Sequence, residues 1–255
     1  MDVEKLFSEF TDAMANGVEA IDGKKAWEQK QFKMSSGSFE ITSFRGNWIE
    51  KASIGRIKLK VEKIIQGPGD KVSPMNLNSL QLNIFPSNPL LPVGLFNVEN
   101  RMGIKGADKL GGYFSIFPMK DEEAITGNIK KLFFSKIKSH GKASSKLLKD
   151  YGELWQWLDW PYKGENGIGM KINAEENEVP FVKDMVMSVL KEYLDCISKL
   201  KDIDFNKEDG DVMFSFRYKL AEFVFMKDPS TKFCFEKGVP LDILTSMIFP
   251  PTVRF

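Results

Sequence analysis

The sequence predicts an α+β protein in which a large, mainly antiparallel sheet of about six or seven strands is sandwiched between two layers of helices. Two observations support this fold class. The elements follow the order helix, run of strands, helices, strands and helix, rather than the regular strand–helix alternation of a parallel sheet. The strands alternate apolar and polar residues, which is typical of antiparallel strands with one solvated face. Because no linker or repeat interrupts residues 1–255, we expect one domain.

The first predicted element is an amphipathic helix over residues 3–21. Apolar residues recur there at helical spacing, namely Val3, Leu6, Phe7, Phe10, Met14, Val18 and Ile21. The polar face carries acidic residues, which an anionic membrane would repel, so we expect this helix to pack on the sheet.

The period then changes to that of strands. Ile57, Leu59 and Val61 alternate with polar residues, as do Leu80, Leu82 and Ile84. The predicted strands are Phe39–Phe44, Ile57–Val61, Leu80–Phe85, Gly112–Phe117, Ile168–Ile172 and Val212–Phe225, the last long enough for a bent strand or a hairpin.

Helices are predicted over Asp121–Ile137 and Phe181–Leu200, the second with Pro180 at its start. Turn signals separate the elements at Gly67-Pro68-Gly69, Ser87-Asn88-Pro89, Lys163–Gly167 and Asp228-Pro229-Ser230.

Composition excludes several classes of function. Lys and Arg number 36 against 35 Asp and Glu, a net charge of +1, which argues against a nucleic-acid partner. No apolar run reaches the length of a membrane span, and no signal peptide is evident. The cysteines, Cys196 and Cys234, are too few for a disulfide framework and favour a reducing compartment, so we expect a cytoplasmic protein with two core thiols.

Common catalytic and metal-binding motifs are absent from the sequence. The single histidine, His140, is expected at a helix end, where the helix dipole favours it. The acidic run Asp121-Glu122-Glu123 is interpreted as a solvated helix start, and we expect neither a metal nor a cofactor. Three tryptophans are interpreted as the edge of the core rather than as a stacking platform: Trp155, Trp157 and Trp160.

The C-terminal residues carry a family resemblance. Arg217-Tyr218, Glu222-Phe223, Asp228–Phe233 and Phe249-Pro250-Pro251 resemble the signature of aerobic coproporphyrinogen III oxidases, roughly R-Y-x-E-F-N-L-x-x-D-R-G-T-K-F followed by a turn, a helix and S-L-P-P. Two extra residues separate Tyr218 from Glu222.

Four earlier blocks resemble the same family, in the correct order. Gly46–Ala52 is similar to G-x-V-F-E-K-A-G, and Ile84–Asn97 to I-H-P-R-N-P-x-x-P-x-x-H-x-N-x-R. Gly111–Pro118 is similar to G-G-x-x-D-L-T-P, and Tyr162–Gly169 to H-R-G-E-x-R-G-I-G-G with one residue missing. The resemblance spans about residues 25 to 255.

The resemblance implies a flat antiparallel sheet between two helical layers and a homodimer. It implies a tetrapyrrole substrate, coproporphyrinogen III, two propionates of which are oxidatively decarboxylated to vinyl groups with oxygen and no organic cofactor, on the way to haem. The substrate-binding residues that it implies are Asn97, Ser115, Arg217 and Lys232. Catalytic residues are not identified.

This sequence departs from the family pattern at its chemical positions. Leu95 stands where the family has a proton-transferring histidine, and Glu99 where it has an arginine for a propionate. Ser115 replaces the aspartate expected to hold pyrrole N–H groups, and Pro229 replaces an arginine. Because carboxylates leaving water need cationic partners, these changes argue against unchanged catalysis.

Three hypotheses therefore remain. The first is an active oxidase with a rearranged site, in which Lys58, Lys60, Arg217 or Lys232 supplies the missing cations. The second is a protein that binds a tetrapyrrole or another carboxylated ligand without decarboxylating it. The third is a bilin reductase, faintly indicated by Phe85-Pro86 to Leu91-Pro92, with His140 as the available histidine.

Overall fold

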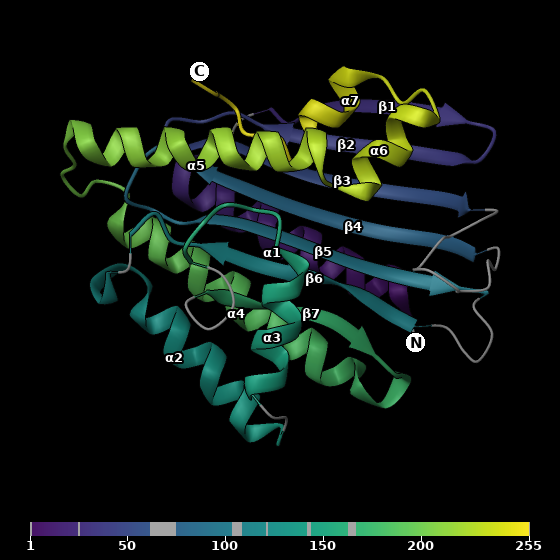
Figure 1. Ribbon diagram of the computed structural model, residues 1–255, viewed down its shortest axis with the longest axis horizontal. Helices are drawn as coiled ribbons and strands as arrows, with labels where there is room; N and C mark the ends of the chain where they lie inside the picture. Colours follow the sequence, from purple (N-terminus) through teal and green to yellow (C-terminus); the bar gives the residue numbers. More distant parts are fainter. Residues whose placement is uncertain are drawn as a thin grey trace.

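A computed structural model describes residues 2–24, 26–61, 75–103, 109–120, 122–141, 144–162 and 167–254, which are built around one antiparallel sheet (Figure 1). The strands are neighbours in the order in which the chain makes them, and every adjacent pair is antiparallel. The strands are β1 (Glu28–Met34), β2 (Gly37–Phe44), β3 (Ile49–Val61), β4 (Met75–Pro86), β5 (Val93–Met102), β6 (Lys109–Phe117) and β7 (Ile168–Ala174).

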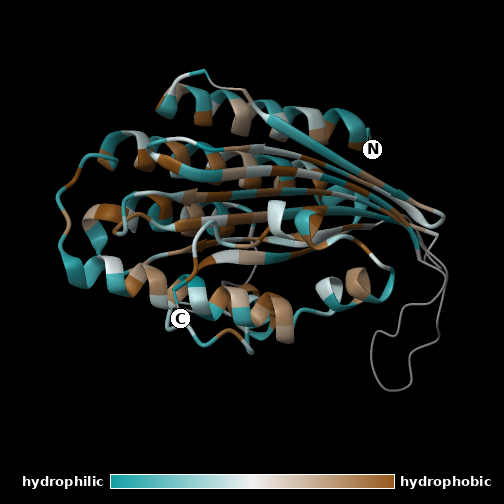
Figure 2. Ribbon diagram, turned by 90° about the horizontal axis from the view of Figure 1, so that it is seen from above, coloured by the Kyte–Doolittle hydropathy of each residue, from teal (hydrophilic) through white to brown (hydrophobic). Residues whose placement is uncertain are grey.

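Helices cover both faces of this sheet, as the view in Figure 2 shows. One layer consists of α1 (Val3–Asp22), α2 (Glu123–Ser139) and α4 (Val179–Leu200), the last preceded by the short 3-10 helix η2 (Glu176–Glu178). The other consists of α5 (Lys207–Met226), α6 (Pro229–Glu236), α7 (Leu241–Ser246) and the end of α3 (Ser144–Leu154). The predicted fold class, an antiparallel sheet between two helical layers, is confirmed. Among the described residues, no helix combines the length and apolar character needed to cross a membrane.

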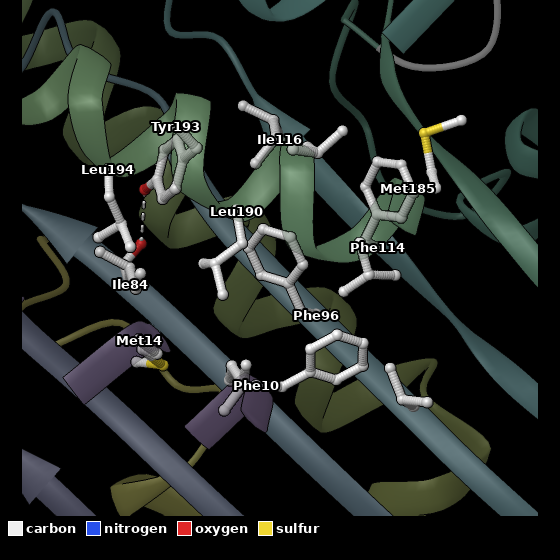
Figure 3. Close-up of a cluster of buried hydrophobic side chains, with 14 of the residues drawn as sticks. Phe10, Met14, Ile84, Phe96, Phe114, Ile116, Met185, Leu190, Tyr193 and Leu194 are labelled. Atoms are coloured by element: carbon white, nitrogen blue, oxygen red, sulfur yellow. Dashed lines mark hydrogen bonds between the residues drawn. The ribbon is translucent and has the colours of Figure 1, made fainter. Parts of the chain in front are cut away.

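The face under α1, α2 and α4, here called the closed face, is filled by apolar side chains (Figure 3). Phe10 from α1 and Phe96 and Phe114 from the sheet are buried together, with the Phe96 and Phe114 ring centroids 6.0 Å apart. The Tyr193 hydroxyl of α4 donates a hydrogen bond of 2.8 Å to the Pro92 carbonyl, so even the polar atom there is satisfied.

Most predicted elements are confirmed. The helices predicted over residues 3–21, Asp121–Ile137 and Phe181–Leu200 correspond to α1, α2 and α4. Five predicted strands lie within β2, β3, β4, β6 and β7. His140 caps the end of α2 and stacks on Phe181, with 3.7 Å between ring centroids. Both cysteine thiols are buried.

The prediction of a strand over Val212–Phe225 is wrong, because this segment belongs to helix α5. Its apolar residues fit either period, but Met213, Phe216, Leu220 and Val224 form the buried stripe of a helix. A capping box begins the helix: the Asn206 side chain accepts from the Asp209 backbone N–H at 3.0 Å, and Asp209 accepts from the Asn206 N–H at 2.8 Å. Likewise, Asp228-Pro229-Ser230 begins α6 rather than forming a simple turn.

Two strands were not predicted, for different reasons. In β5 nearly every side chain is buried, so the apolar–polar alternation is lost. Edge strand β1 is mostly polar and half-exposed. The expected turns at Gly67-Pro68-Gly69 and Lys163–Gly167 fall outside the described residues, apart from Gly167, as does Asp121 of the acidic run.

Candidate functional site

The opposite face of the sheet, here called the cavity face, holds an internal space of about 460 Å³. Its floor is formed by side chains of β2 to β6, and its walls by Trp155 and the helices α6 and α7. We call this space the sheet cavity. Its volume lies within the range of about 300–1,000 Å³ that is usual for small-molecule sites.

Strand periodicity places polar side chains on this floor. In β4, Ser79 and Gln81 face the sheet cavity, while Leu80 and Leu82 belong to the core of the closed face. In β5, Asn97 and Glu99 line the cavity in the same way. The side-chain alternation that the sequence shows over Leu80–Phe85 therefore assigns Gln81 to the cavity face.

The polar floor is a connected chain of hydrogen bonds. The Ser79 hydroxyl donates to Asn97 Oδ1 at 2.7 Å, and Asn97 Nδ2 donates to Glu99 Oε1 at 2.7 Å. Arg101 donates from Nε and Nη2 to Glu99 Oε2, at 2.8 and 2.5 Å. Glu99 thus presents a carboxylate to the cavity while it holds the nearby guanidinium of Arg101.

The glycine pair of β6 makes room for this chain. Gly112 has φ of 113°, and a Cβ there would lie 2.0 Å from the Asn97 carbonyl oxygen. A Cβ at Gly111 would lie 2.8 Å from the Arg101 guanidinium carbon. A side chain at Gly112 would strain the backbone and clash, so the glycine fixes how closely β6 approaches Asn97.

Tyr113 adds a phenol beside two carboxylates. Burial raises its pKa far above the ordinary value, and the charges of Asp228 and Glu99 raise it further. The phenol is therefore neutral at any physiological pH, with an O–H that is able to donate a hydrogen bond. Its hydroxyl makes no hydrogen bond to another described residue.

Asp228 contributes a second carboxylate to the cavity lining, but its oxygens already accept hydrogen bonds from the start of α6. It caps α6 by accepting from the Thr231 N–H at 2.8 Å, the Thr231 hydroxyl at 2.7 Å and the Ser230 N–H at 3.3 Å. Cys234 also lines the cavity, and burial raises the pKa of its thiol to about 12, so it remains protonated.

The four residues expected to bind substrate are not brought together. Asn97 lines the sheet cavity. Ser115 is fully buried beneath Trp155, whose indole N–H donates to the Ser115 hydroxyl at 2.8 Å. Lys232 is exposed on α6 and does not line the cavity, while Arg217 lies deep in the core.

Arg217 is held by residues near the start of β3. A β-bulge at residues 49–51 shifts the strand register, and Glu50 and Lys51 both bond to the layer of α5 and α7. Glu50 Oε2 lies 2.7 Å from Arg217 Nη2, which also donates to the Pro86 carbonyl at 3.2 Å. The Glu-Lys block of the family resemblance therefore supports the C-terminal helices.

Lys51 is buried and fastens the chain after α7. Its ammonium donates to the carbonyls of Thr245, Met247 and Phe249 at 2.7, 2.8 and 2.6 Å. Burial holds its pKa well below the ordinary value, and the nearby charges of Arg45 and Lys30 lower the pKa further. Since residues 244 and 247–249 line the sheet cavity, Lys51 fixes one of its walls.

Two cations proposed for a rearranged site lie elsewhere. Lys58 Nζ is 3.4 Å from Glu4 of α1, which places it on the closed-face side, and Lys60 lines a shallow hollow together with Lys58 and Glu4.

Two residues of the site were not identified from the sequence: Glu99 was named only as a replaced arginine, and Tyr113 was given no role. Strand geometry links both to Asn97, because Glu99 follows it by two residues on β5 and Tyr113 is its partner on β6. Trp155 and Trp160 are buried as expected, whereas Trp157 is 65% exposed.

Among the described residues, no group of three or more His, Cys, Asp or Glu side chains is arranged to hold a metal ion. The charged groups that line the described part of the sheet cavity are Glu99 and Asp228, both anionic.

A family model described as coproporphyrinogen III oxidase matches residues 2–255. No curated protein matches the sequence. Among solved structures, the chain resembles phytochromobilin synthase from tomato in complex with biliverdin, at 11% sequence identity and a TM-score of 0.48, over 96% of this chain and 78% of that one.

Proposed function

The chain belongs to the coproporphyrinogen III oxidase family, and from this premise we propose that it binds a tetrapyrrole-related ligand in the sheet cavity without the family's oxidative decarboxylation. The proposal rests on one observation, which is that residues from distant parts of the chain meet in the same cavity. Asn97, Tyr113 and Asp228 come from three separate blocks of family resemblance, and all three line this one cavity.

The walls of the cavity suit the body of such a ligand. Phe39, Leu77 and Trp155 offer apolar and aromatic contact, while Asn97 and Tyr113 offer a few polar atoms. This combination of apolar walls with sparse, fixed polar groups is usual for sites that bind ring systems. We propose Asn97 as a ligand contact. Contact by Ser115, Arg217 or Lys232 stays a prediction, and for Ser115 it requires displacement of Trp155.

Three replaced positions argue against decarboxylation. Glu99 puts a negative charge where the family pattern has a cation for a propionate, and like charges brought together cost several kcal/mol. Leu95, at the position of the family histidine, is completely buried in the core and carries no transferable proton. Ser115, at the position of the aspartate, is covered by Trp155.

The test has a binding arm and a turnover arm. We expect saturable binding of coproporphyrin III or of a bilin, followed by absorbance and tryptophan quenching, and weaker binding by Asn97→Ala with Asn47→Ala as an exposed control. With freshly reduced coproporphyrinogen III in air, mass spectrometry is expected to show no loss of CO2 above a protein-free control. Vinyl products would establish the active oxidase. Absence of binding by a folded protein to porphyrins and bilins would remove the tetrapyrrole proposal.

Glu99→Gln tests whether the charge of this carboxylate weakens the binding of a carboxylated ligand. Removing the carboxylate charge releases Arg101, so this variant is expected to bind coproporphyrin more tightly than the wild type. The matched control is Glu40→Gln, which makes the same change on the exposed surface of β2. Equal affinities for wild type and Glu99→Gln would show that no ligand carboxylate approaches this position.

The homodimer implied by the resemblance is proposed here as well, and light scattering coupled to size-exclusion chromatography measures it directly. A single domain over residues 1–255 and a cytoplasmic location stay predictions. One cooperative unfolding transition is the expected outcome for one domain.

A further inference from the structure

A second cavity lies on the other side of the segment that follows α7. It has a volume of about 900 Å³ and is bordered by β1, the end of β2, α5 and residues 249–253. We call it the edge cavity. Residues 245–249 separate it from the sheet cavity, since this segment contributes to the lining of both.

Three cations gather in the edge cavity: Lys30, Arg45 and Lys51. They are close enough that the charges of Arg45 and Lys30 both disfavour the protonated form of Lys51. Lys30 lies 3.8 Å from Asp242 in a long ion pair, and the Asp242 side chain is 64% exposed. The cluster is therefore weakly compensated by the part of the chain that the structure describes.

Each cation has a different capacity to bind. Lys51 already donates three hydrogen bonds to backbone carbonyls, so it has no N–H left for a ligand. Arg45 is exposed, and its one side-chain hydrogen bond to another described residue is a long contact of 3.5 Å from Nη1 to the Glu50 carbonyl. Most of the donor fork of Arg45 therefore remains available for an anion.

Two carboxylates, Glu28 and Glu222, also line the cavity. Within the described residues, no ion pair of 4 Å or less joins either of them to the three cations. They offset much of the positive charge in the lining, which favours a monoanion over a dianion. The rest of the wall is apolar, with Phe225 and Met226 from α5 and Phe249 and Pro250 from the C-terminal segment.

From this combination we infer that the edge cavity is a second ligand site, for an organic monocarboxylate on an apolar body. The carboxylate binds to the Arg45 guanidinium in two-point fashion, with Lys30 beside it. The apolar body lies against Phe225 and Phe249. Apart from Phe249, which lines both cavities, this inference uses none of the residues that line the sheet cavity, and it stands independently of the tetrapyrrole proposal.

The test uses decanoate as the probe, with decanol as its uncharged match, in isothermal titration calorimetry of the full chain. Decanoate is expected to bind at one site, and more weakly as salt is raised. Arg45→Gln is expected to weaken decanoate binding by about tenfold, because it removes a hydrogen-bonded charge pair. Arg45 is exposed, so this substitution leaves the fold intact.

Lys33→Gln is the matched control. It makes the same change of charge as Lys30→Gln on the same strand, but three residues away on the opposite side. Lys30→Gln is expected to weaken decanoate binding and Lys33→Gln to leave it unchanged. Equal affinity for decanoate and decanol, or decanoate binding that is indifferent to Arg45→Gln, would overturn the inference. So would competition between decanoate and a porphyrin that is abolished by Asn97→Ala, because that result places the probe in the sheet cavity.

Discussion

The two faces of the sheet have the same backbone and different side-chain chemistry. On the closed face, α1, α2 and α4 cover apolar side chains that fill the space between helix and sheet. On the cavity face, the same strands carry Ser79, Asn97 and Glu99, and the covering helices leave a cavity of about 460 Å³. Alternate side chains of the same strands therefore have different roles: those on one face stabilise the sheet, and those on the other face form the site.

Two phenylalanines, one on each face of the sheet, are expected to differ most in their contribution to stability. Phe96→Ala on the closed face is expected to lower the free energy of unfolding by about 3–5 kcal/mol, because neighbours packed on all sides cannot fill the space. Phe39→Ala is expected to cost at least about 1 kcal/mol less, because part of that ring already borders a cavity. Urea denaturation measures both. Equal losses would mean that the cavity face is packed as tightly as the closed face.

Lys51 tests how firmly the cavity wall is held. Lys51→Met is expected to destabilise the protein by about 1–3 kcal/mol, because three carbonyl acceptors lose their donor. The folded-state pKa lies below the ordinary value of 10.5, so in the window between them the unfolded chain holds a proton that the folded chain lacks. Stability contributed by this residue therefore rises as pH approaches 10.5.

The measurement is chemical denaturation of wild type and Lys51→Met at several pH values up to that window. The stability difference between them is expected to grow with pH in favour of the wild type. A difference that stays constant would show that the carbonyl acceptors outweigh burial and keep the lysine charged throughout.

Two helix N-caps are expected to differ by a smaller amount in their contribution to the free energy of unfolding. Asp228→Ala at the start of α6 is expected to cost about 1–2 kcal/mol, since its carboxylate accepts from two backbone N–H groups and a hydroxyl. Asp2→Ala at the start of α1 is expected to cost about 0.5–1 kcal/mol, because it caps one exposed N–H at 3.0 Å. Thermal melts of both variants make the comparison. A larger loss for Asp2 would indicate that α6 contributes little to the folded core.

The division between the faces could be predicted only in part from the sequence. Alternation in Leu80–Phe85 identified a strand with two distinct faces, and the helical stripes of α1 and α4 were equally clear. The segment of α5 was ambiguous, since its apolar residues fit both periods and the capping box at Asn206 and Asp209 decided between them. In β5, which is buried on both sides, the apolar–polar pattern of the sequence does not reveal the strand.

The site was harder to predict than the fold because it depends on contacts between distant segments. Asn97 was expected in the site and lines the sheet cavity. Arg217 carries the same kind of sequence signal, yet an ion pair with Glu50 across 167 positions of the chain holds it in the core. Nothing in either residue's local sequence distinguishes a ligand contact from a structural ion pair.

Two tyrosine hydroxyls, one on each face, are expected to differ least in their contribution to stability. Tyr193→Phe on the closed face is expected to cost about 0.5–1.5 kcal/mol, because the Pro92 carbonyl loses its donor at 2.8 Å in a buried setting. Tyr113→Phe is expected to change stability by less than about 0.5 kcal/mol, because its hydroxyl bonds to no other described residue. If Tyr113 is a group of the site, the same substitution weakens porphyrin or bilin binding while Tyr193→Phe does not. Denaturation and titration of both variants therefore separate the two roles, and a Tyr113 variant that loses stability but keeps its affinity would assign that hydroxyl to the fold.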